Sequence, residues 1–534
     1  MQRENFINFF FLFFFFAYLF LILLFVGINF LVASDQLDPD FGWHLRTGQL
    51  ILERGVPKVD WYSYTMSDFL WIDHSWLTNV LIYKIYSAFG FGVLFLVFLI
   101  LSVLPFIILI EPKLFWFYLL PVIVGFLAIL GFLGIRPQII TVLFVAIFWK
   151  ILIGFFQDQK FSQRLIYFVP LLFIIWVNLH GGFFAGLFIL FLILILEIFK
   201  KTIFFRKLIS WPLFRQQNYK EQSTKKILIL LAILVLSFLA TLINPYGLRI
   251  YEEVFRTIGD PFLRFHIAEW LPLFFGGPFP VFIILYIGLF LGLLIPLRKK
   301  IEFSKLILVL VFFVFSLLNQ RHFFIFVILS VPVFAEIVFY FKKEVKPEMV
   351  KILFSGFKKW IIVVFVLGTL GYGLYPALRD SFKKDKISFY PEKALPFLKT
   401  LPLSENLLNE YAWGGYLIWQ LPERKVFIDG RMPSWRKDGQ FVFGDYVKIM
   451  KVEPGFQDVL RKYNIKIMLL EKEDNKDNFK RELRAENRFA NFLIRHNWLL
   501  KFSGLYPQKS LYQELVGLGW KTIYEDKTTV ILRR

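Results

Sequence analysis

Apolar runs of about twenty residues recur along this chain, and they constrain its fold more than any other feature. A helix of about that length crosses the hydrocarbon core of a bilayer. Hydrophobic residues make up 57% of the 534 residues and mean hydropathy is +0.61, which is more apolar than a soluble core requires. The sequence therefore predicts a polytopic α-helical membrane protein with about eleven transmembrane helices, at 6–32, 90–110, 114–134, 138–156, 165–179, 183–199, 227–243, 279–297, 305–319, 323–341 and 360–376.

The distribution of lysine and arginine predicts how these spans are oriented. Cationic residues gather in alternate loops, around Lys113, around Lys160, and within 200–226, 298–305 and 342–359. Because cationic loops stay in the cytoplasm, the N-terminus is predicted to be cytoplasmic. The first span is too long and too aromatic for a cleaved signal peptide, so we expect it to remain as an anchor. An odd number of spans then places everything after the last span outside the cell membrane.

The net charge of +21 does not indicate nucleic-acid binding. The basic residues that produce it lie in short loops between apolar runs, where the membrane topology already accounts for them. The chain has no cysteine, which excludes disulfides, thiolate chemistry and cysteine-ligated metals. The bilayer is therefore the first partner that the composition predicts.

The sequence changes character near residue 378, which predicts two parts. Residues 1–377 are expected to form the membrane bundle, including a first external loop at 33–76, and residues 378–534 a soluble α/β domain on the outer face. The expected elements of this domain are helices at 392–401 and 455–463, strands at 425–428 and 465–471, and a hairpin of 520–525 with 528–532 across Asp526-Lys527.

Polar residues whose side chains can bind a ligand or take part in catalysis lie on one side of the predicted membrane. On the segmentation above, all of them lie in outer loops or at outer helix ends, which predicts a shared site there. They are Asp38, Asp40, His44, Asp73, His74, Arg136, Asn178-Leu179-His180-Gly181-Gly182, Asn244-Pro245-Tyr246-Gly247, the segment His266 to Trp270, Arg321 and His322.

The first external loop contains the closest grouping of ionisable residues. Asp38 and Asp40 are two residues apart beside the membrane, and they are followed by His44, Asp73 and His74. Such carboxylates can serve as a base or present oxygens to a divalent cation such as magnesium or manganese. The alternative is that the aspartates form turns while the Trp and Tyr residues of the loop form an interfacial belt. The coincidence of two carboxylates, two histidines and Arg46 favours a functional loop.

These motifs resemble a known superfamily. Asp38-Pro39-Asp40, an aromatic pair and His44-Leu45-Arg46 resemble the first external loop of GT-C glycosyltransferases, which include oligosaccharyltransferase catalytic subunits and protein mannosyltransferases. The later motifs are similar, in order, to those of a bacterial branch of GT-C-like membrane proteins. They are Asn178 to Gly182, Asn244 to Gly247, Glu269-Trp270, Arg321-His322, Tyr411 to Leu417 and Arg424 to Arg431.

The resemblance implies a glycosyltransferase in a bacterial inner membrane. It would move a sugar from a polyprenyl-phosphate donor to a glycan, lipid or protein acceptor on the outer face. Asp40 would be the base, and Asp38, His44 and His74 would act beside it. The donor phosphate would be bound by Arg136, Arg249, Arg264, Arg321 and His322, or by a divalent ion held by Asp38 and Asp40. Further expected site residues are Asp73, His180, His266, Glu269 and, in a tail that roofs the site, Trp413, Tyr416, Asp429 and Arg431.

Several of these motifs have a structural alternative. The histidines can be belt residues bonded to loop carbonyls, and no His-Glu-x-x-His spacing supports a catalytic zinc. Gly181-Gly182 can serve helix packing, Asn244 to Gly247 a turn, and Trp413 to Tyr416 a tight entry to a buried helix. Ala412 and Gly415 depart from the oligosaccharyltransferase motif, which puts asparagine-linked glycosylation in doubt.

Two other classes of function remain open on the sequence alone. One is a transporter of a lipid-linked sugar or polymer, which should carry ionisable residues in the middle of several spans. The centres of the predicted spans are nearly free of charge. The other is a non-catalytic subunit of a polysaccharide assembly complex, which would leave Asp38 and Asp40 without a chemical role. The glycosyltransferase is therefore the favoured hypothesis.

Overall fold

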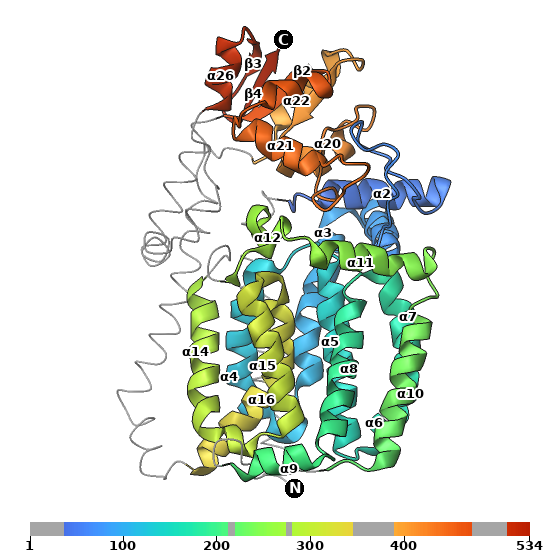
Figure 1. Cartoon of the computed structure of the whole chain (residues 1–534), viewed down its shortest axis with the longest axis vertical. Helices are drawn as coiled ribbons and strands as arrows, with labels where there is room; N and C mark the ends of the chain where they lie inside the picture. Colours follow the sequence, from blue (N-terminus) through green and yellow to red (C-terminus); the bar gives the residue numbers. More distant parts are fainter. Residues whose placement is uncertain (1–36, 212–218, 220, 274–279, 345–388, 473–509) are drawn as a thin grey trace.

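The computed structural model describes residues 37–211, 219, 221–273, 280–344, 389–472 and 510–534, and the predicted spans 6–32 and 360–376 lie outside them. A bundle of long helices carries a smaller mixed domain at one end (Figure 1). We call residues 389–534 the tail, and we call the end of the bundle that carries them the tail end.

The bundle consists of apolar helices. Six of the described helical stretches are long and apolar enough to cross a membrane, or seven if the bent pair α8 and α9 counts as one span. This confirms an integral membrane protein, although the described residues hold fewer such helices than the eleven predicted. The helices are α3 (Trp76–Leu109), α4 (Phe115–Ile129), α5 (Gln138–Phe156), α6 (Lys160–Leu165), α7 (Val169–Leu179), α8 (Phe183–Phe199), α9 (Ile203–Ser210), α10 (Thr224–Ala240), α14 (Pro280–Leu297), α15 (Phe303–Leu318) and α16 (Phe323–Glu344).

The segment predicted as the first external loop is more helical than expected. It contains the amphipathic helix α2 (Phe41–Arg54), and α3 begins at Trp76 rather than at residue 90. The backbone of Gly90 has φ 77°, a conformation that glycine adopts readily, and α3 is kinked there. The predicted start of the span thus coincides with the kink, because hydropathy registers only the apolar part of the helix.

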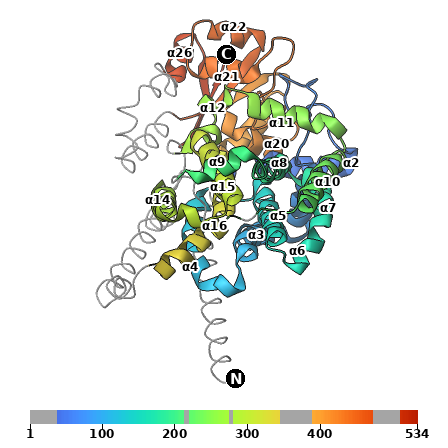
Figure 2. The same ribbon diagram turned by 60° about the horizontal axis from the view of Figure 1, so that its bottom comes forward.

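Consecutive long helices run in opposite directions, so the turns between them alternate between the two ends of the bundle. The helices α2, α11 (Ile250–Gly259) and α12 (Leu263–His266) lie across the tail end, whereas α9 lies across the opposite end (Figure 1). Figure 2 shows the opposite end turned forward, with the long helices side by side. The polar motifs of the sequence therefore fall at the tail end, in turns or in the short helices α2 and α12, as their common sidedness predicts.

The opposite end carries its own buried ion pairs. The ammonium group of Lys200 lies 2.7 Å from a Glu197 carboxylate oxygen and 2.6 Å from one of Glu302. Lys305 pairs with Glu336 between α15 and α16. These pairs connect α8, α15 and α16 close to the cationic loops.

The tail contains a four-stranded mixed sheet in the order β1-β2-β4-β3. β1 (Asn406–Asn409) is parallel to β2 (Ile465–Glu471), whereas β4 (Thr529–Arg533) is antiparallel to both β2 and β3 (Lys521–Glu525). The tail helices are α19 (Leu395–Thr400), α20 (Gly414–Gln420), α21 (Val442–Met450), α22 (Phe456–Lys462) and α26 (Leu511–Gly517).

Most of the predicted tail elements are confirmed, including the hairpin across Asp526-Lys527. The strand predicted at 425–428 is wrong: only Val426 forms a bridge there, and its partner is Ser63 in the first loop. Val426 donates its backbone N–H to Tyr62 and accepts from Tyr64. The backbone of Val426 pairs with a loop about 360 residues earlier rather than with a strand of the tail, and local sequence does not encode such pairing.

The first loop and the tail share one hydrophobic core. Trp43, Tyr62, Phe69 and Trp71 from the loop pack in the same cluster as the interior of the tail sheet. Phe69 stacks on Trp435 at 4.4 Å between ring centroids. The residues that connect Asp38 to α3 are therefore held by the tail as well as by the bundle.

Candidate active site

The centre of the candidate site is a carboxylate–arginine cluster. Arg136, in the turn before α5, forms an ion pair with Asp38 and a second one with Glu269 at 2.7 Å. Glu269 lies in the 3-10 turn η5 (Ala268–Trp270), so the cluster joins three segments that are distant in sequence. Although burial opposes it, the two carboxylates raise the pKa of Arg136. Arg136 is thus a permanent cation that holds these segments together.

Asp40 lies beside this cluster as the N-cap residue of α2. Its Oδ1 accepts a hydrogen bond from the Trp43 indole at 2.9 Å, and its backbone N–H donates to Asp38. Burial raises the pKa of Asp40 to about 7, and the negative charges of Asp38 and Glu269 also favour the protonated form. A carboxylate that titrates near neutral pH is well matched to general-base chemistry.

Arg321 is the second arginine near the cluster. It lies in η7 (Gln320–His322) between α15 and α16, with its guanidinium 5.2 Å from the centre of the Trp270 ring. Its charge and that of Arg136 lower the pKa of Glu269 against the effect of burial. Within the described part of the chain, no carboxylate lies within ion-pair distance of Arg321. Its positive charge is therefore less compensated than that of Arg136.

The other predicted phosphate-binding residues are placed differently. Arg249 is half exposed just before α11 and lies 3.7 Å from Glu252. Arg264 is exposed on α12. His322 follows Arg321, and its Nδ1 is buried without a hydrogen-bond partner among the described residues. The strongest links to the carboxylate cluster are thus the ion pairs of Arg136 and the charge of Arg321 that acts on Glu269.

A buried series of hydrogen bonds, from His44 through Asn79 to Asp73, links α2 to the first turns of α3. His44 Nδ1 lies 2.6 Å from Asn79 Oδ1, and the Asn79 amide donates to Asp73 at 2.8 Å. Because the Asn79 nitrogen donates to Asp73, the Asn79 oxygen is the atom that faces His44. This oxygen can only accept, so the proton belongs on His44 Nδ1. Burial lowers the pKa of His44 to about 3 and raises that of Asp73 to about 6. His44 is therefore neutral, and Asp73 orients the chain.

His74 and His180 form a second pair. Their rings meet edge to face at 5.7 Å between centroids. The Gly182 N–H donates to His180 Nδ1 at 3.1 Å, so this nitrogen is an acceptor, and the Thr141 hydroxyl lies 2.7 Å from it. A side chain at Gly181 would meet His74 at 3.0 Å. Gly181 and Gly182 thus allow close packing, which is the structural alternative given above for this motif. The groups that pack against them are His74, His180 and Thr141.

His266 fits the alternative interpretation, in which the histidine is bonded to a backbone carbonyl. Its Nδ1 lies 3.0 Å from the Phe262 carbonyl, and its ring stacks on that of Phe262 at 3.8 Å. The ring also meets Phe443 of the tail edge to face. These contacts assign His266 to the seam between α12 and the tail.

Arg431 and Asp429 form a buried ion cluster rather than an open surface. Two nitrogens of Arg431 lie 2.8 and 2.6 Å from the two Asp429 oxygens, and Nη2 also lies 2.8 Å from Asp60 of the first loop. The guanidinium packs against Tyr62 and Trp71 at 4.7 and 4.3 Å from the ring centres. The cluster therefore connects the tail to the first loop.

Trp413 and Tyr416 are likewise engaged in packing. The Trp413 indole donates to the Phe389 carbonyl at 2.8 Å. Tyr416 stacks on Tyr390 at 4.4 Å, and the Tyr390 hydroxyl donates to Leu37 just before Asp38. The roof predicted for the site is thus a packed seam whose aromatic residues reach the beginning of the first loop.

The arrangement around Asp38 and Asp40 does not fit a divalent cation. Asp38, one of the two carboxylates expected to hold such an ion together with Asp40, is already paired with Arg136. Among the described residues, no group of three or more His, Cys, Asp or Glu side chains is placed to hold a metal. We therefore assign no step to the magnesium or manganese ion considered on sequence grounds.

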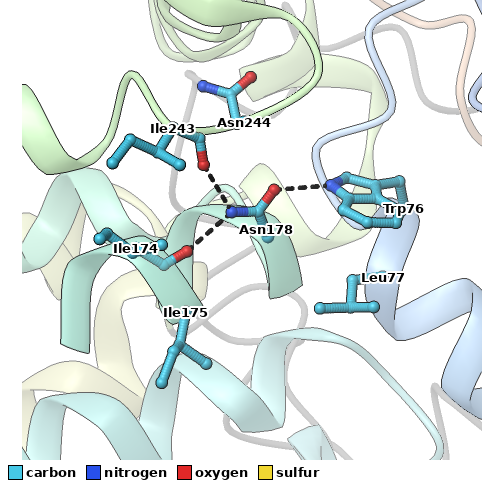
Figure 3. A pocket seen from close by; sticks show the side chains of 7 residues that line it. All are labelled: Trp76, Leu77, Ile174, Ile175, Asn178, Ile243 and Asn244. Carbon is cyan, nitrogen blue, oxygen red and sulfur yellow. Dashed lines mark hydrogen bonds between the residues drawn. The ribbon is translucent and has the colours of Figure 1, made fainter. Parts of the chain in front are cut away.

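A pocket lies between α3, α7 and the residues that follow α10 (Figure 3). It has a volume of 540 Å³ and is lined by Trp76, Leu77, Ile174, Ile175, Asn178, Ile243 and Asn244. Figure 3 shows Asn178 at its centre, where the side chain accepts from the Trp76 indole and donates to the carbonyls of Ile174 and Ile243. Asn178 therefore joins α3, α7 and the end of α10. Because most of the lining residues are apolar, the pocket is suited to a hydrocarbon chain.

Sequence reasoning selected none of five residues of this region as site residues, although Tyr411 and Gly430 lie within the motifs quoted for the resemblance. Asn79 and Thr141 orient the histidines, Asp60 completes the Arg431 cluster, and Gly430 contacts Asp40. The fifth is Tyr411, whose pKa is raised by burial and by the charges of Asp40 and Glu269. Asn79 and Thr141 carried a signal, because polar residues in apolar helices tend to have a role. The roles of Asp60, Gly430 and Tyr411 became visible only through long-range contacts.

Comparisons with known proteins gave matches among solved structures. No family model and no curated protein matches the chain. The chain is similar to the oligosaccharyltransferase AglB from Archaeoglobus fulgidus in complex with an inhibitory peptide and a dolichol-phosphate, with 13% identity and a TM-score of 0.48 over 83% of this chain and 68% of that one. It is also similar to ArnT from Cupriavidus metallidurans bound to undecaprenyl phosphate, with 13% identity and a TM-score of 0.45 over 97% and 98% of the two chains.

Proposed function

We propose that this protein is a membrane glycosyltransferase of GT-C type that moves a sugar from a polyprenyl-phosphate donor to an acceptor at the outer face. The observation that carries the proposal is the position of Asp40. Its carboxylate has a pKa raised to about 7 and lies beside the ion-paired Arg136 in the motif that resembles the first GT-C loop. A base and cations gathered at a membrane surface are what transfer from a lipid phosphate requires.

The proposed step is a displacement at the anomeric carbon of the donor sugar. The acceptor oxygen forms a bond to that carbon while the bond from the carbon to the phosphate oxygen breaks. The acceptor proton goes to the Asp40 carboxylate, and the electron pair of the broken bond remains on the phosphate. Arg321, which has no carboxylate partner among the described residues, stabilises that charge, while Arg136 holds Asp38 and Glu269 in place.

The placement of charge favours an enzyme over a transporter. Two of the ion pairs within the described bundle, Lys200 with Glu197 and Lys305 with Glu336, lie towards the end opposite the tail. A transporter is expected to place ionisable groups at mid-membrane near its substrate. The cluster around Asp40 lies instead beyond the helix ends.

An assay of purified protein with radiolabelled polyprenyl-phosphate sugars tests the proposal. Each donor in a panel of hexose, pentose and amino-sugar phosphates is incubated with membrane extract as the source of acceptor, and label that leaves the carrier is measured. At least one donor is expected to lose its label in a time-dependent way. No turnover with any donor, from protein shown to be folded, would contradict the proposal.

The pH dependence of transfer follows from the raised pKa of Asp40. A general base acts in its ionised form, so transfer is expected to fall as the pH decreases through about 7, approaching tenfold per unit well below that value. The measurement is kcat/KM for the donor between pH 5.5 and 8.5, with thermal stability recorded at each pH. A rate that is constant over this interval would be incompatible with Asp40 as the base.

The orientation of the bundle is a separate prediction. Because cationic loops remain cytoplasmic, a reporter fused after Arg206 is expected to report the cytoplasm and one fused after Asp380 the exterior. Paired enzymatic reporters that are active on opposite sides provide the measurement. If both fusions report the same side, the site does not face the exterior.

A further inference from the structure

We infer that Gly430 of the tail is a positioning residue for Asp40. The missing side chain at this position leaves the space that the Asp40 carboxylate occupies. The tail thereby sets the position of the group proposed above as the base. The inference deepens the proposed function and rests on it for the catalytic consequence, although the contact itself can be tested separately.

The contact is close. A Cβ atom placed on Gly430 would lie 1.8 Å from Asp40 Oδ1, 2.8 Å from its Cγ and 3.2 Å from Oδ2. The carboxylate thus lies directly over the α-carbon of a residue 390 positions later in the chain. Gly430 is not among the described glycines with a positive φ, so its backbone accepts an L-residue, and the obstacle to a side chain is Asp40.

The turn that carries Gly430 is anchored on both sides. Asp429 and Arg431 are bound in the buried ion cluster with Asp60. A side chain at Gly414 would meet Ile428 O at 2.3 Å and Asp429 Cα at 2.7 Å, so α20 packs directly on the backbone of this turn. The turn cannot retreat easily, whereas the Asp40 side chain can rotate.

A second pair of glycines fixes the backbone on the Asp40 side. A Cβ atom on Gly42 would lie 2.2 Å from Gly415 O, and one on Gly415 would lie 2.2 Å from Pro39 O. The start of α2 is therefore pressed against α20, which is itself pressed against the 428–430 turn. Asp40 is enclosed between the two, and the least constrained response to a methyl group at position 430 is a displacement of its carboxylate.

Gly430→Ala is the test. The added methyl group requires the Oδ1 atom of the carboxylate to retreat by about 1.6 Å, from 1.8 Å to the 3.4 Å at which ordinary contact begins. Misplacement of a reacting group by as little as about 1 Å costs about a hundredfold in rate. We expect kcat to fall by that order while KM for the donor stays unchanged, because Arg321 is untouched. Gly517→Ala is the matched control, since a Cβ atom at the end of α26 meets nothing within 4 Å, and it should retain wild-type kcat.

A double-mutant cycle separates positioning from general damage. Asp40→Ala removes the atoms that the methyl group would meet, so adding Gly430→Ala to that variant should change neither kcat nor the apparent unfolding temperature. Gly430→Ala alone should lower the unfolding temperature by overpacking, and Asp40→Ala should restore it.

The two readouts distinguish the possible failures. Wild-type kcat in Gly430→Ala, or equal losses of unfolding temperature with and without the Asp40 carboxylate, would overturn the inference. If the wild-type protein transfers no sugar at all, the proposed function fails, and the stability cycle still decides whether Gly430 holds Asp40.

Discussion

Asp40→Asn is expected to slow sugar transfer by about a hundred- to ten-thousand-fold, which is the range for loss of a general base. Asparagine keeps the shape of the side chain and an oxygen that can accept from the Trp43 indole, so α2 should form as before. It cannot take up the acceptor proton. The measurement is kcat with the best donor of the radiolabelled panel, together with the unfolding temperature.

Asp68→Asn provides the matched control in the same loop. The Asp68 side chain is 76% exposed and pairs only with the partly exposed Lys437, so its loss should leave transfer near the wild-type rate. Added manganese should not restore Asp40→Asn, because Asp38 is already paired with Arg136. Wild-type turnover by Asp40→Asn would move the search for the base to Glu269 and Asp73.

Arg431→Met is expected to destabilise the seam between the tail and the first loop by about 3–5 kcal/mol. It leaves the buried carboxylates of Asp429 and Asp60 without their cation, and an uncompensated buried charge has a cost of that order. The apparent unfolding temperature in detergent should fall, and the segment around residues 55–70 should become sensitive to protease. Transfer should fall as well, because the turn that carries Gly430 loses its anchor.

Arg533→Met is the control for this effect. Arg533 pairs with Glu405 within the tail, but its side chain is 42% exposed, and exposed ion pairs contribute about 0–1 kcal/mol. Its unfolding temperature should stay close to that of the wild type. If Arg431→Met were as stable as Arg533→Met and as resistant to protease, the buried cluster would not be what joins the tail to the loop.

These predictions depend on the sequence and the structure to different degrees. Hydropathy located most of the described apolar helices to within a few residues, because membrane partition is decided by local composition. The exception is α3, which begins at Trp76, 14 residues before the predicted span. The tail elements at 392–401, 455–471 and 520–532 were also predictable, since their periodicity and turn residues are local. The segment at 425–428 was predicted wrongly, because its only bridge is to Ser63 in another part of the chain.

The sequence by itself determined that the polar motifs share one end of the bundle, since that follows from counting spans. It did not determine which of them meet. Arg136 with Glu269, Arg431 with Asp60 and Gly430 with Asp40 are separated by 133, 371 and 390 residues, and no periodicity connects them. Hydropathy records how far each residue prefers lipid or water, whereas these contacts depend on how helix ends and the tail pack against one another. Only the tertiary structure therefore decided that Arg136 holds carboxylates, that Arg431 is buried and that Asp40 lies against a glycine of the tail.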